Sequence, residues 1–257
     1  SKKQCGALNA DYIKPPDKRE YGRLIQHWGP VIKRWSFAPE LCGSEEFYLC
    51  LKQNHIIGSV GHSDGTLEDV RRVYDKGCRL ATHLYSGMST ITRHFGYRKL
   101  GVIEAALLLD EMAVEVIADA KHLPPELLQL IYKIKGDGKI CLVTDAMRGA
   151  GMPEGPSILG GLEDGTPFVI EDGVAKLTDK SAFAGSVATA DRLVRTYVQK
   201  AGVPLEAAVR MMTANPAEAM RLEKKGDLLP GMDADILIFD GDINIKKVII
   251  MGREIIL

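Results

Sequence analysis

The sequence predicts an α/β protein with a parallel sheet, either open or belonging to a (β/α)8 barrel. Short apolar runs alternate with amphipathic stretches up to residue 146, which is the pattern of successive β/α units. The runs are apolar at consecutive positions, as expected of strands that are buried on both faces. A length of 257 residues with 46% hydrophobic residues is sufficient for a large core. Five such units are too few to close an eight-stranded barrel, so the open sheet and the incomplete barrel remain alternatives at this point.

Several of the predicted units carry their own start or stop signals. Thr66 can cap the helix that follows the second strand, and Gly77 ends that helix. Pro124 and Pro125 stand where the first turn of a helix tolerates proline. The predicted strands are 31–37, 55–63, 79–85, 113–120 and 139–146, and the helices between them are 45–53, 66–77, 102–109 and one that begins at 124, with a loop over 86–99.

The alternation changes after residue 146. Residues 149–173 are rich in glycine and predict a long loop with a hairpin, whose short strands continue through VAKLT. The segment 183–186 is expected to open a long helix that continues to residue 200, and two helical pieces follow over 204–221. Residues 226–257 predict short strands separated by Gly-Asp turns.

Composition excludes several classes of protein. Lys and Arg total 33 against 34 Asp and Glu, so no basic surplus is available for general nucleic-acid binding. The longest apolar runs are far too short to cross a bilayer, and the polar first residues lack the apolar stretch of a secretory signal. Five scattered cysteines without a C-x-x-C pair argue against a disulfide framework and against a cysteine zinc site. The sequence therefore predicts a cytoplasmic protein that binds neither nucleic acid nor membranes.

Ionisable side chains stand at or just beyond the ends of four of the five predicted strands. They are His62, His83, Asp119 with His122 shortly after it, and Asp145. Each one alone is more often structural, as a hydrogen-bonded histidine or a helix-capping aspartate. Together they are expected at the carboxyl edge of a parallel sheet, where the active sites of such folds are built. Two imidazoles and a carboxylate suit a divalent metal such as zinc, and Asp145 is then placed to exchange a proton with water.

Six segments occur in the order found in N-acetylglucosamine-6-phosphate deacetylases, which belong to the amidohydrolase superfamily. They are GHSDGT at 61–66, ATHLYSGM at 81–88, IADAKHLPPE at 117–126, LVTDAM at 142–147, FAGS at 183–186, and TANPAEAM…KKGDLLPGMDADILIFD over 213–240. The chain resembles this family over nearly its whole length. The resemblance implies a TIM-type (β/α)8 metal-dependent hydrolase barrel without its first strands over residues 1–225. It implies part of a small β-sandwich domain, its C-terminal strands, over 226–257.

The resemblance also implies roles for individual residues. His62 and His83 would be ligands of a divalent metal, with zinc expected, and Asp145 would be the catalytic acid and base. His122 would contact the substrate near the reacting N-acetyl group. Arg98 aligns with the phosphate-binding arginine of the family, which the neighbouring subunit of a dimer often contributes and which pairs with phosphate in a bidentate manner. The other implied substrate-binding residues are Ala7, Leu8, Ser86, Gly87, Phe183, Ala184 and Gly185.

The implied reaction is metal-dependent hydrolysis of the N-acetyl group of N-acetylglucosamine 6-phosphate by a homodimer, in amino-sugar catabolism. The products are glucosamine 6-phosphate and acetate. Ser86 and Gly87 depart from an Asn-Ala pair that is common in the family, and the family's metal-binding glutamate is expected upstream of residue 1. Two alternatives stay open. One is another amidohydrolase, of the dihydroorotase or N-acyl-amino-acid deacylase kind, and the other is a non-catalytic binding protein that lacks one metal ligand.

Overall fold

A five-stranded parallel sheet forms the centre of the molecule. The computed structural model describes residues 1–256, and its central strands are β1 (Arg34–Phe37), β2 (Ile57–Val60), β3 (Leu80–Ala81), β6 (Ala113–Val116) and β7 (Ile140–Leu142). They lie in the order β1-β2-β3-β6-β7, and every neighbouring pair is parallel. A sheet that keeps chain order throughout is typical of a barrel wall, because a doubly wound sheet reverses its strand order. The carboxyl ends of all five strands therefore share one edge.

The segment 183–186 pairs with the chain that follows β7 and does not open a helix. Ser186 forms a parallel bridge with Ala146, and the Ser186 N–H donates to the main-chain oxygen of Asp145 at 2.9 Å. The helix expected from 183 begins only as α6 (Ala190–Gln199), so that prediction was wrong for 183–189. The reason is tertiary: short, small-residue segments carry no local preference strong enough to reveal that they pair with a strand distant in sequence.

Helices connect the central strands and begin where their caps predict. In front of α3 (Leu67–Asp75), Thr66 and Asp69 form a capping box, in which each side chain accepts the main-chain N–H of the other residue. In α5 (Pro125–Lys135) proline stands in the first turn. Within residues 1–256 no helix combines the length and the apolar content needed to cross a membrane. The other helices are η1 (Lys2–Gln4), η2 (Ala10–Tyr12), α1 (Lys18–Trp28), α2 (Ser44–Gln53), α4 (Val102–Leu108), α7 (Leu205–Met212) and α8 (Ala214–Ala219).

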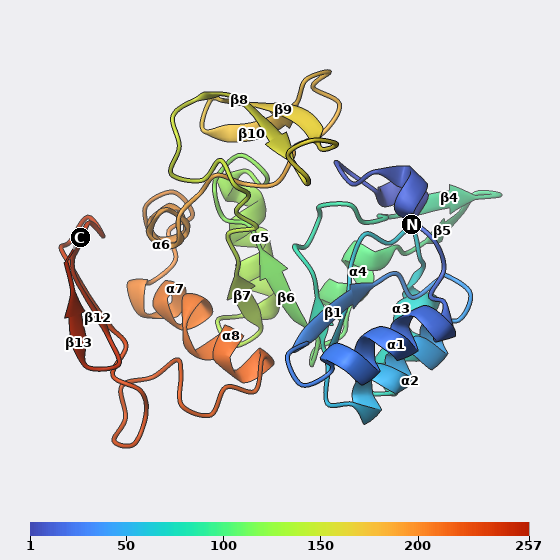
Figure 1. Ribbon diagram of the computed structural model, residues 1–257, viewed down its shortest axis with the longest axis horizontal. Coiled ribbons are helices and arrows are strands. Elements are labelled where there is room, and N and C mark those ends of the chain that lie inside the picture. The colour runs from blue at the N-terminus through green and yellow to red at the C-terminus, as the bar shows by residue number, and fades with distance from the viewer. Residues whose placement is uncertain (257) are drawn as a thin grey trace.

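A three-stranded antiparallel sheet follows β7 and lies over one end of the molecule (Figure 1). Its strands β8 (Gly155–Leu159), β9 (Thr166–Glu171) and β10 (Val174–Leu177) pair in the order β10-β9-β8, as the short strands expected in this region predict. Phe168 and Ile170 of β9 and Ala175 of β10 form a small apolar cluster with Ala184. This cluster attaches the outer sheet to the segment 183–186.

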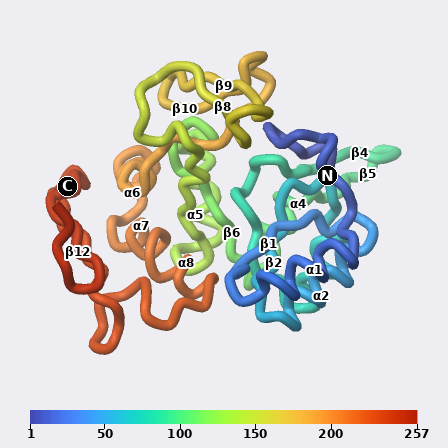
Figure 2. The backbone as a smooth tube through the Cα atoms, viewed as in Figure 1, coloured from blue at the N-terminus to red at the C-terminus, as the bar shows by residue number. Residues whose placement is uncertain are grey.

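Two further antiparallel elements lie at opposite sides of the molecule (Figure 2). The tail forms β11 (Ile236–Phe239), β12 (Ile245–Ile250) and β13 (Arg253–Ile255), in the order β11-β12-β13. On the other side, the predicted loop 86–99 contains a hairpin of β4 (Thr92–His94) and β5 (Tyr97–Lys99), which projects from the body (Figure 1). The sequence pattern does not predict this hairpin, whose residues are all exposed.

One apolar core joins the central sheet, its helices and the base of the tail. Val60 of β2, Val114 of β6 and Leu128 of α5 are fully buried in it. Ile243, which connects β11 to β12, is 3% exposed and belongs to the same core. Arg195 of α6 also donates to the main-chain oxygen of Ile243 at 2.7 Å. The tail strands are thus anchored to the rest of the chain through their connection.

Lys135 makes the free energy of unfolding depend on pH. It is 8% exposed, and its Nζ donates to the main-chain oxygens of Ala106 and Leu109 at 3.1 and 2.9 Å. Burial lowers the pKa of Lys135 to about 8 from an ordinary value of 10.5. The unfolded chain therefore binds more protons than the folded protein between pH 8 and 10.5, so this group makes stability rise with pH in that window. We expect the rise to be on the order of 2 kcal/mol.

Lys135→Met should remove this rise, whereas the exposed Lys133→Met should retain it. Urea unfolding of both variants and the parent protein at pH 7.5, 9 and 10 measures the difference. Parallel pH profiles for the parent protein and Lys135→Met would show that the buried ammonium group has no such effect.

Candidate functional site

Two histidines face each other at the carboxyl edge of the central sheet. His62 follows β2 and His83 follows β3, and their Nε2 atoms lie 3.1 Å apart with the ring planes at 86°. Two nitrogens bound to one tetrahedral zinc ion at about 2.0–2.1 Å would lie about 3.3 Å apart. The spacing therefore fits two ligands of a single ion.

A main-chain carbonyl determines which nitrogen of His62 is free. Nδ1 lies 2.7 Å from the main-chain oxygen of Gln4, which can only accept, so Nδ1 carries the proton and Nε2 presents a lone pair. This kind of hydrogen bond orients metal-binding imidazoles. Gly87 has a φ of +55°, and a Cβ there would lie 2.8 Å from both His62 Nδ1 and the Gln4 oxygen. Gly87, which was predicted to bind substrate, thus lies against the His62 ring.

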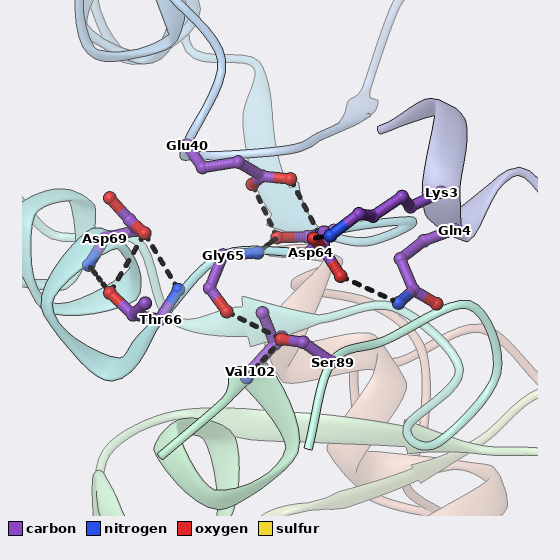
Figure 3. Close-up of polar contacts among 10 residues, drawn as sticks. Lys3, Gln4, Glu40, Asp64, Gly65, Thr66, Asp69, Ser89 and Val102 are labelled. Atoms are coloured by element: carbon purple, nitrogen blue, oxygen red, sulfur yellow. Dashed lines mark hydrogen bonds and ion pairs between the residues drawn. The ribbon is translucent and has the colours of Figure 1, made fainter. Parts of the chain in front are cut away.

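Glu40 holds the loop that follows His62. It stands just after β1, where its Oε2 accepts the Ser63 hydroxyl at 2.6 Å and its Oε1 accepts the Asp64 N–H at 2.7 Å. The Asp64 carboxylate in turn accepts from Nε2 of Gln4 at 3.1 Å (Figure 3). The side chain of Gln4 therefore anchors the same residue whose carbonyl orients His62.

His83 is buried and lies next to the ion pair of Glu115 and Arg34. Burial, together with the facing His62 imidazole, lowers the pKa of His83, which favours the neutral form that binds metals. The main-chain N of His83 lies 3.4 Å from Oε2 of Glu115 and donates to it. The same carboxylate oxygen also accepts a hydrogen bond from Nη2 of Arg34 at 2.8 Å. The Nδ1 atom of His83 is buried and has no hydrogen-bond partner within residues 1–256.

The histidine pair fits a divalent metal by donor type, by the protonation of His62 and by spacing. A complete set of ligands is not found, because within residues 1–256 no three His, Cys, Asp or Glu side chains converge. Glu40 does not supply the third ligand, because both of its oxygens are bonded to the loop after His62. The described part of the chain thus brings together two imidazoles of the kind that bind catalytic zinc, whereas such sites usually have three protein ligands.

Three of the predicted site residues turn the chain with an unusual backbone conformation. The φ angles are +46° at His62, +24° at His83 and +47° at Asp145. Non-glycine residues seldom adopt positive φ, and such residues concentrate at functional sites. Asp145 is exposed, and its negative charge acts on His83, where it opposes the lowering of the pKa. Its carboxylate makes no hydrogen bond within residues 1–256, which leaves it available for proton transfer.

His122 follows β6, which lies between β3 and β7 in the sheet. Its Nδ1 lies 2.8 Å from Oδ2 of Asp119, and its ring packs edge-on against Phe183 with centroids 4.9 Å apart. Gly185 follows at a φ of +80°, where a Cβ would lie 3.2 Å from the main-chain oxygen of Asp145. The segment 183–186 thus links the surroundings of His122 to those of Asp145.

None of the remaining predicted residues has a side-chain hydrogen bond to His62 or His83 within residues 1–256. Ala7 and Ala184 meet in the small apolar cluster beside β9 and β10, and Leu8 is 52% exposed. The Ser86 N–H donates to the main-chain oxygen of His83 at 3.1 Å. Arg98 is exposed on β5, and the one hydrogen bond of its side chain within residues 1–256 goes to the Gly96 oxygen at 3.2 Å. Substrate contacts for these residues stay predictions.

Four residues that support the site were missed in the sequence. Arg34 and Glu115 lie within apolar strands, and a charged residue inside a buried strand is the signal that would have identified them. Glu40 follows a strand end, as the predicted residues do. Gln4 acts through its main-chain carbonyl, for which side-chain patterns give no signal.

A chain-ordered parallel sheet with two converging imidazoles and a free carboxylate at its carboxyl edge is the arrangement expected of a barrel-type metal-dependent hydrolase. Comparison with known families agrees with this class: the chain belongs to the amidohydrolase family, which matches over residues 36–255. The α/β fold class and the resemblance given in the sequence analysis are therefore confirmed.

Curated relatives are similar along almost the whole chain. The N-acetylglucosamine-6-phosphate deacetylase of Lysinibacillus sphaericus is 37% identical over 98% of this chain and 63% of its own length. The N-acetylgalactosamine-6-phosphate deacetylase of Escherichia coli O157:H7 is 31% identical over 96% of this chain and 63% of its own length. The chain thus spans less than two thirds of these relatives.

Solved structures show the same architecture. The N-acetyl-D-glucosamine-6-phosphate deacetylase of Mycobacterium smegmatis superposes with a TM-score of 0.92 at 29% identity, covering 100% of this chain and 66% of that one. A mutant of the same enzyme in complex with N-acetyl-D-glucosamine-6-phosphate gives a TM-score of 0.91 at 29% identity, over 99% of this chain and 65% of that one. These similarities establish the barrel-type fold of the matched part.

Proposed function

We propose that the protein hydrolyses the N-acetyl group of N-acetylglucosamine 6-phosphate, which yields glucosamine 6-phosphate and acetate. The observation that carries the proposal is the pair His62 and His83, whose Nε2 atoms converge 3.1 Å apart at the edge that also bears Asp145 and His122. The names of the similar proteins support the substrate class, since deacetylases of amino-sugar 6-phosphates match 96–98% of the chain.

In this proposal His62 and His83 hold a divalent metal, zinc, through Nε2. Such an ion, when bound, lowers the pKa of water to about 7 and polarises a carbonyl group. The histidines supply neutral nitrogen ligands for it, because Gln4 keeps the His62 proton on Nδ1 and burial favours the neutral form of His83. Within residues 1–256 no third side chain of a metal-binding type converges with them.

Asp145 is the proposed general base and acid. It removes a proton from the attacking water as the new C–O bond forms at the acetyl carbon. When the C–N bond breaks, it returns that proton to the sugar nitrogen, so acetate and an amine leave. His122 is proposed to donate from Nε2 to the carbonyl oxygen, where negative charge develops in the transition state.

The sugar phosphate would be bound by the remaining predicted residues, with Phe183 beside His122 and Arg98 at the phosphate. Arg98 lies on the projecting hairpin β4–β5, which also exposes Phe95 and Tyr97 at 88% and 78%. Exposed aromatic residues beside basic ones are common in protein interfaces, so we propose a homodimer in which this hairpin contacts a second copy. We also propose that the protein is cytoplasmic, because its five cysteines are all unpaired. We further propose that the barrel portion of the chain ends at residue 225 and that the small β-domain begins at residue 226.

The test is acetate release by the natural full-length protein from four compounds. N-acetylglucosamine 6-phosphate and N-acetylgalactosamine 6-phosphate differ at one hydroxyl, and N-acetylglucosamine lacks the phosphate. An N-acetyl amino acid represents the alternative deacylase activity. We expect the first compound to give the highest kcat/KM, at least tenfold above the unphosphorylated sugar, and a chelator to abolish the activity until zinc is restored.

Other outcomes are equally informative. A higher kcat/KM with the galactosamine compound would move the proposal to the second sugar. A preference for the N-acetyl amino acid would replace the amino-sugar proposal, and no acetate from any compound by the metal-loaded protein would support a binding role.

A further inference from the structure

The side chain of Asp119 is completely enclosed, and all its hydrogen bonds go to the turn that carries His122. The carboxylate is 0% exposed and the His122 side chain is 6% exposed. Oδ1 accepts the main-chain N–H groups of Lys121 and His122 at 2.9 and 2.8 Å. Oδ2 faces Nδ1 of His122 at 2.8 Å. Burial by itself would raise the pKa of Asp119, but the bonds from His122 and Lys121 lower it, so the carboxylate is ionised at neutral pH.

An ionised carboxylate can only accept hydrogen bonds, so the proton between the two side chains belongs to Nδ1 of His122. Nε2 has no hydrogen-bond partner within residues 1–256. If Nε2 is also to donate to a substrate oxygen, the ring must carry protons on both nitrogens. An imidazolium cation next to a buried carboxylate is electrostatically balanced, and its Nε2–H forms a charge-assisted bond.

The other charged groups near Asp119 and His122 do not form an ion pair with the Asp119 carboxylate. Arg192 of α6 donates from Nη2 to the main-chain oxygen of Asp119 at 3.1 Å, and from Nη1 to that of Gly173 at 3.1 Å. The guanidinium is thus bonded to main chain and not to the carboxylate. Lys121 is exposed to solvent. Neither cation is hydrogen-bonded to the His122 ring, which leaves Asp119 as the charged group in contact with it.

We propose that Asp119 is a positioning residue for His122: it holds one proton on Nδ1, and its buried charge balances the doubly protonated ring that donates from Nε2 to the carbonyl oxygen of the N-acetyl group. This deepens the proposed function and rests on it for the identity of the oxygen. The position of the Nδ1 proton is independent of any substrate.

The variant Asp119→Asn tests the position of the Nδ1 proton separately from the contact with the substrate oxygen. The amide oxygen of asparagine can still accept the two main-chain N–H groups, so its NH2 group must face Nδ1 of His122. A donor facing Nδ1 forces the ring into the neutral form with its proton on Nε2. The variant therefore keeps the cap of the turn while it reverses the protonation of the ring. Asp110→Asn, an exposed aspartate just before β6 at the opposite end of the strand, is the matched control.

The first readout is 15N NMR of histidine-labelled protein, in which the His122 signals are assigned by their loss in His122→Asn. Six histidines in this sequence keep the spectrum interpretable. We expect Nδ1 to be protonated in the parent protein and in Asp110→Asn, and to lose its proton in Asp119→Asn. An unprotonated Nδ1 in the parent protein overturns the proposal without any activity measurement, even if the variant does not fold.

The second readout is kinetic. Asp119→Asn should lower kcat on the order of 100-fold with little change in KM, because the lost interaction belongs to the transition state. In the His122→Asn background the same change should have no further effect on kcat, since Asp119 acts through His122. Equal kcat for Asp119→Asn and the parent protein, or full additivity of the two changes, overturns the proposal. If the parent protein releases no acetate, the proposed function fails, while the NMR result still decides the role of Asp119.

Discussion

Replacing Asp145 by asparagine is expected to lower kcat for acetate release by about 10³- to 10⁴-fold, because the amide can neither take the proton of water nor deliver it to the leaving nitrogen. Bound metal should be unchanged, since the two imidazole ligands converge independently of Asp145. Acetate release and metal content of the purified full-length protein measure the two quantities separately.

Asp137→Asn is the matched control for this change. Asp137 precedes the same strand, β7, at its opposite end and has a half-exposed side chain 3.8 Å from Arg210. We expect its kcat to be within twofold of the parent value. Retention of more than a tenth of kcat in Asp145→Asn would remove Asp145 from its proposed role, and loss of metal with activity would identify it as a ligand.

Replacing Arg34 by methionine is expected to lower the free energy of unfolding by about 3 kcal/mol, because it leaves the Glu115 carboxylate buried without a counter-ion. Arg34 Nη2 donates to Glu115 Oε2 at 2.8 Å and to Thr82 Oγ1 at 2.9 Å, and the Glu115 side chain is 7% exposed. Burial already raises the pKa of Glu115, an effect that Arg34 opposes. Guanidinium unfolding at pH 7 measures the loss.

The double change Arg34→Met with Glu115→Gln should recover at least half of that loss. Glutamine has no charge to bury, and its oxygen can still accept the His83 N–H. Arg210→Met removes an exposed arginine from a loose surface pair and should cost less than about 1 kcal/mol. A double variant no more stable than Arg34→Met would mean that the cost comes from lost packing and not from the unpaired charge.

Much of the fold was accessible from local patterns. The five central strands and their helices follow from apolar runs and caps, as at Thr66 and Pro125, because these preferences act within a few residues. The segment 183–186 was misjudged, since its bridge to residue 146 joins parts of the chain that are distant in sequence. The hairpin β4–β5 was missed because its polar, exposed residues give no apolar alternation.

The candidate site was also predictable only in part from the sequence. The residue types and their places at strand ends determined His62, His83, His122 and Asp145 as candidates, because side chains that follow parallel strands must share one edge. Only the tertiary structure decided which nitrogens face each other, and that depends on partners distant in sequence, such as the carbonyl of Gln4.

What the sequence by itself determined is therefore the succession of central strands and helices and the chemical groups at the edge of the sheet, since both follow from local apolar patterning and from residue identity. What only the tertiary structure decided is which partners those groups have: Nδ1 of His122 lies 2.8 Å from Asp119, and the ion pair of Arg34 and Glu115 lies next to His83. The physical reason is that protonation and orientation depend on burial and on hydrogen-bond partners. Both are set by contacts between strands and turns that lie far apart along the chain.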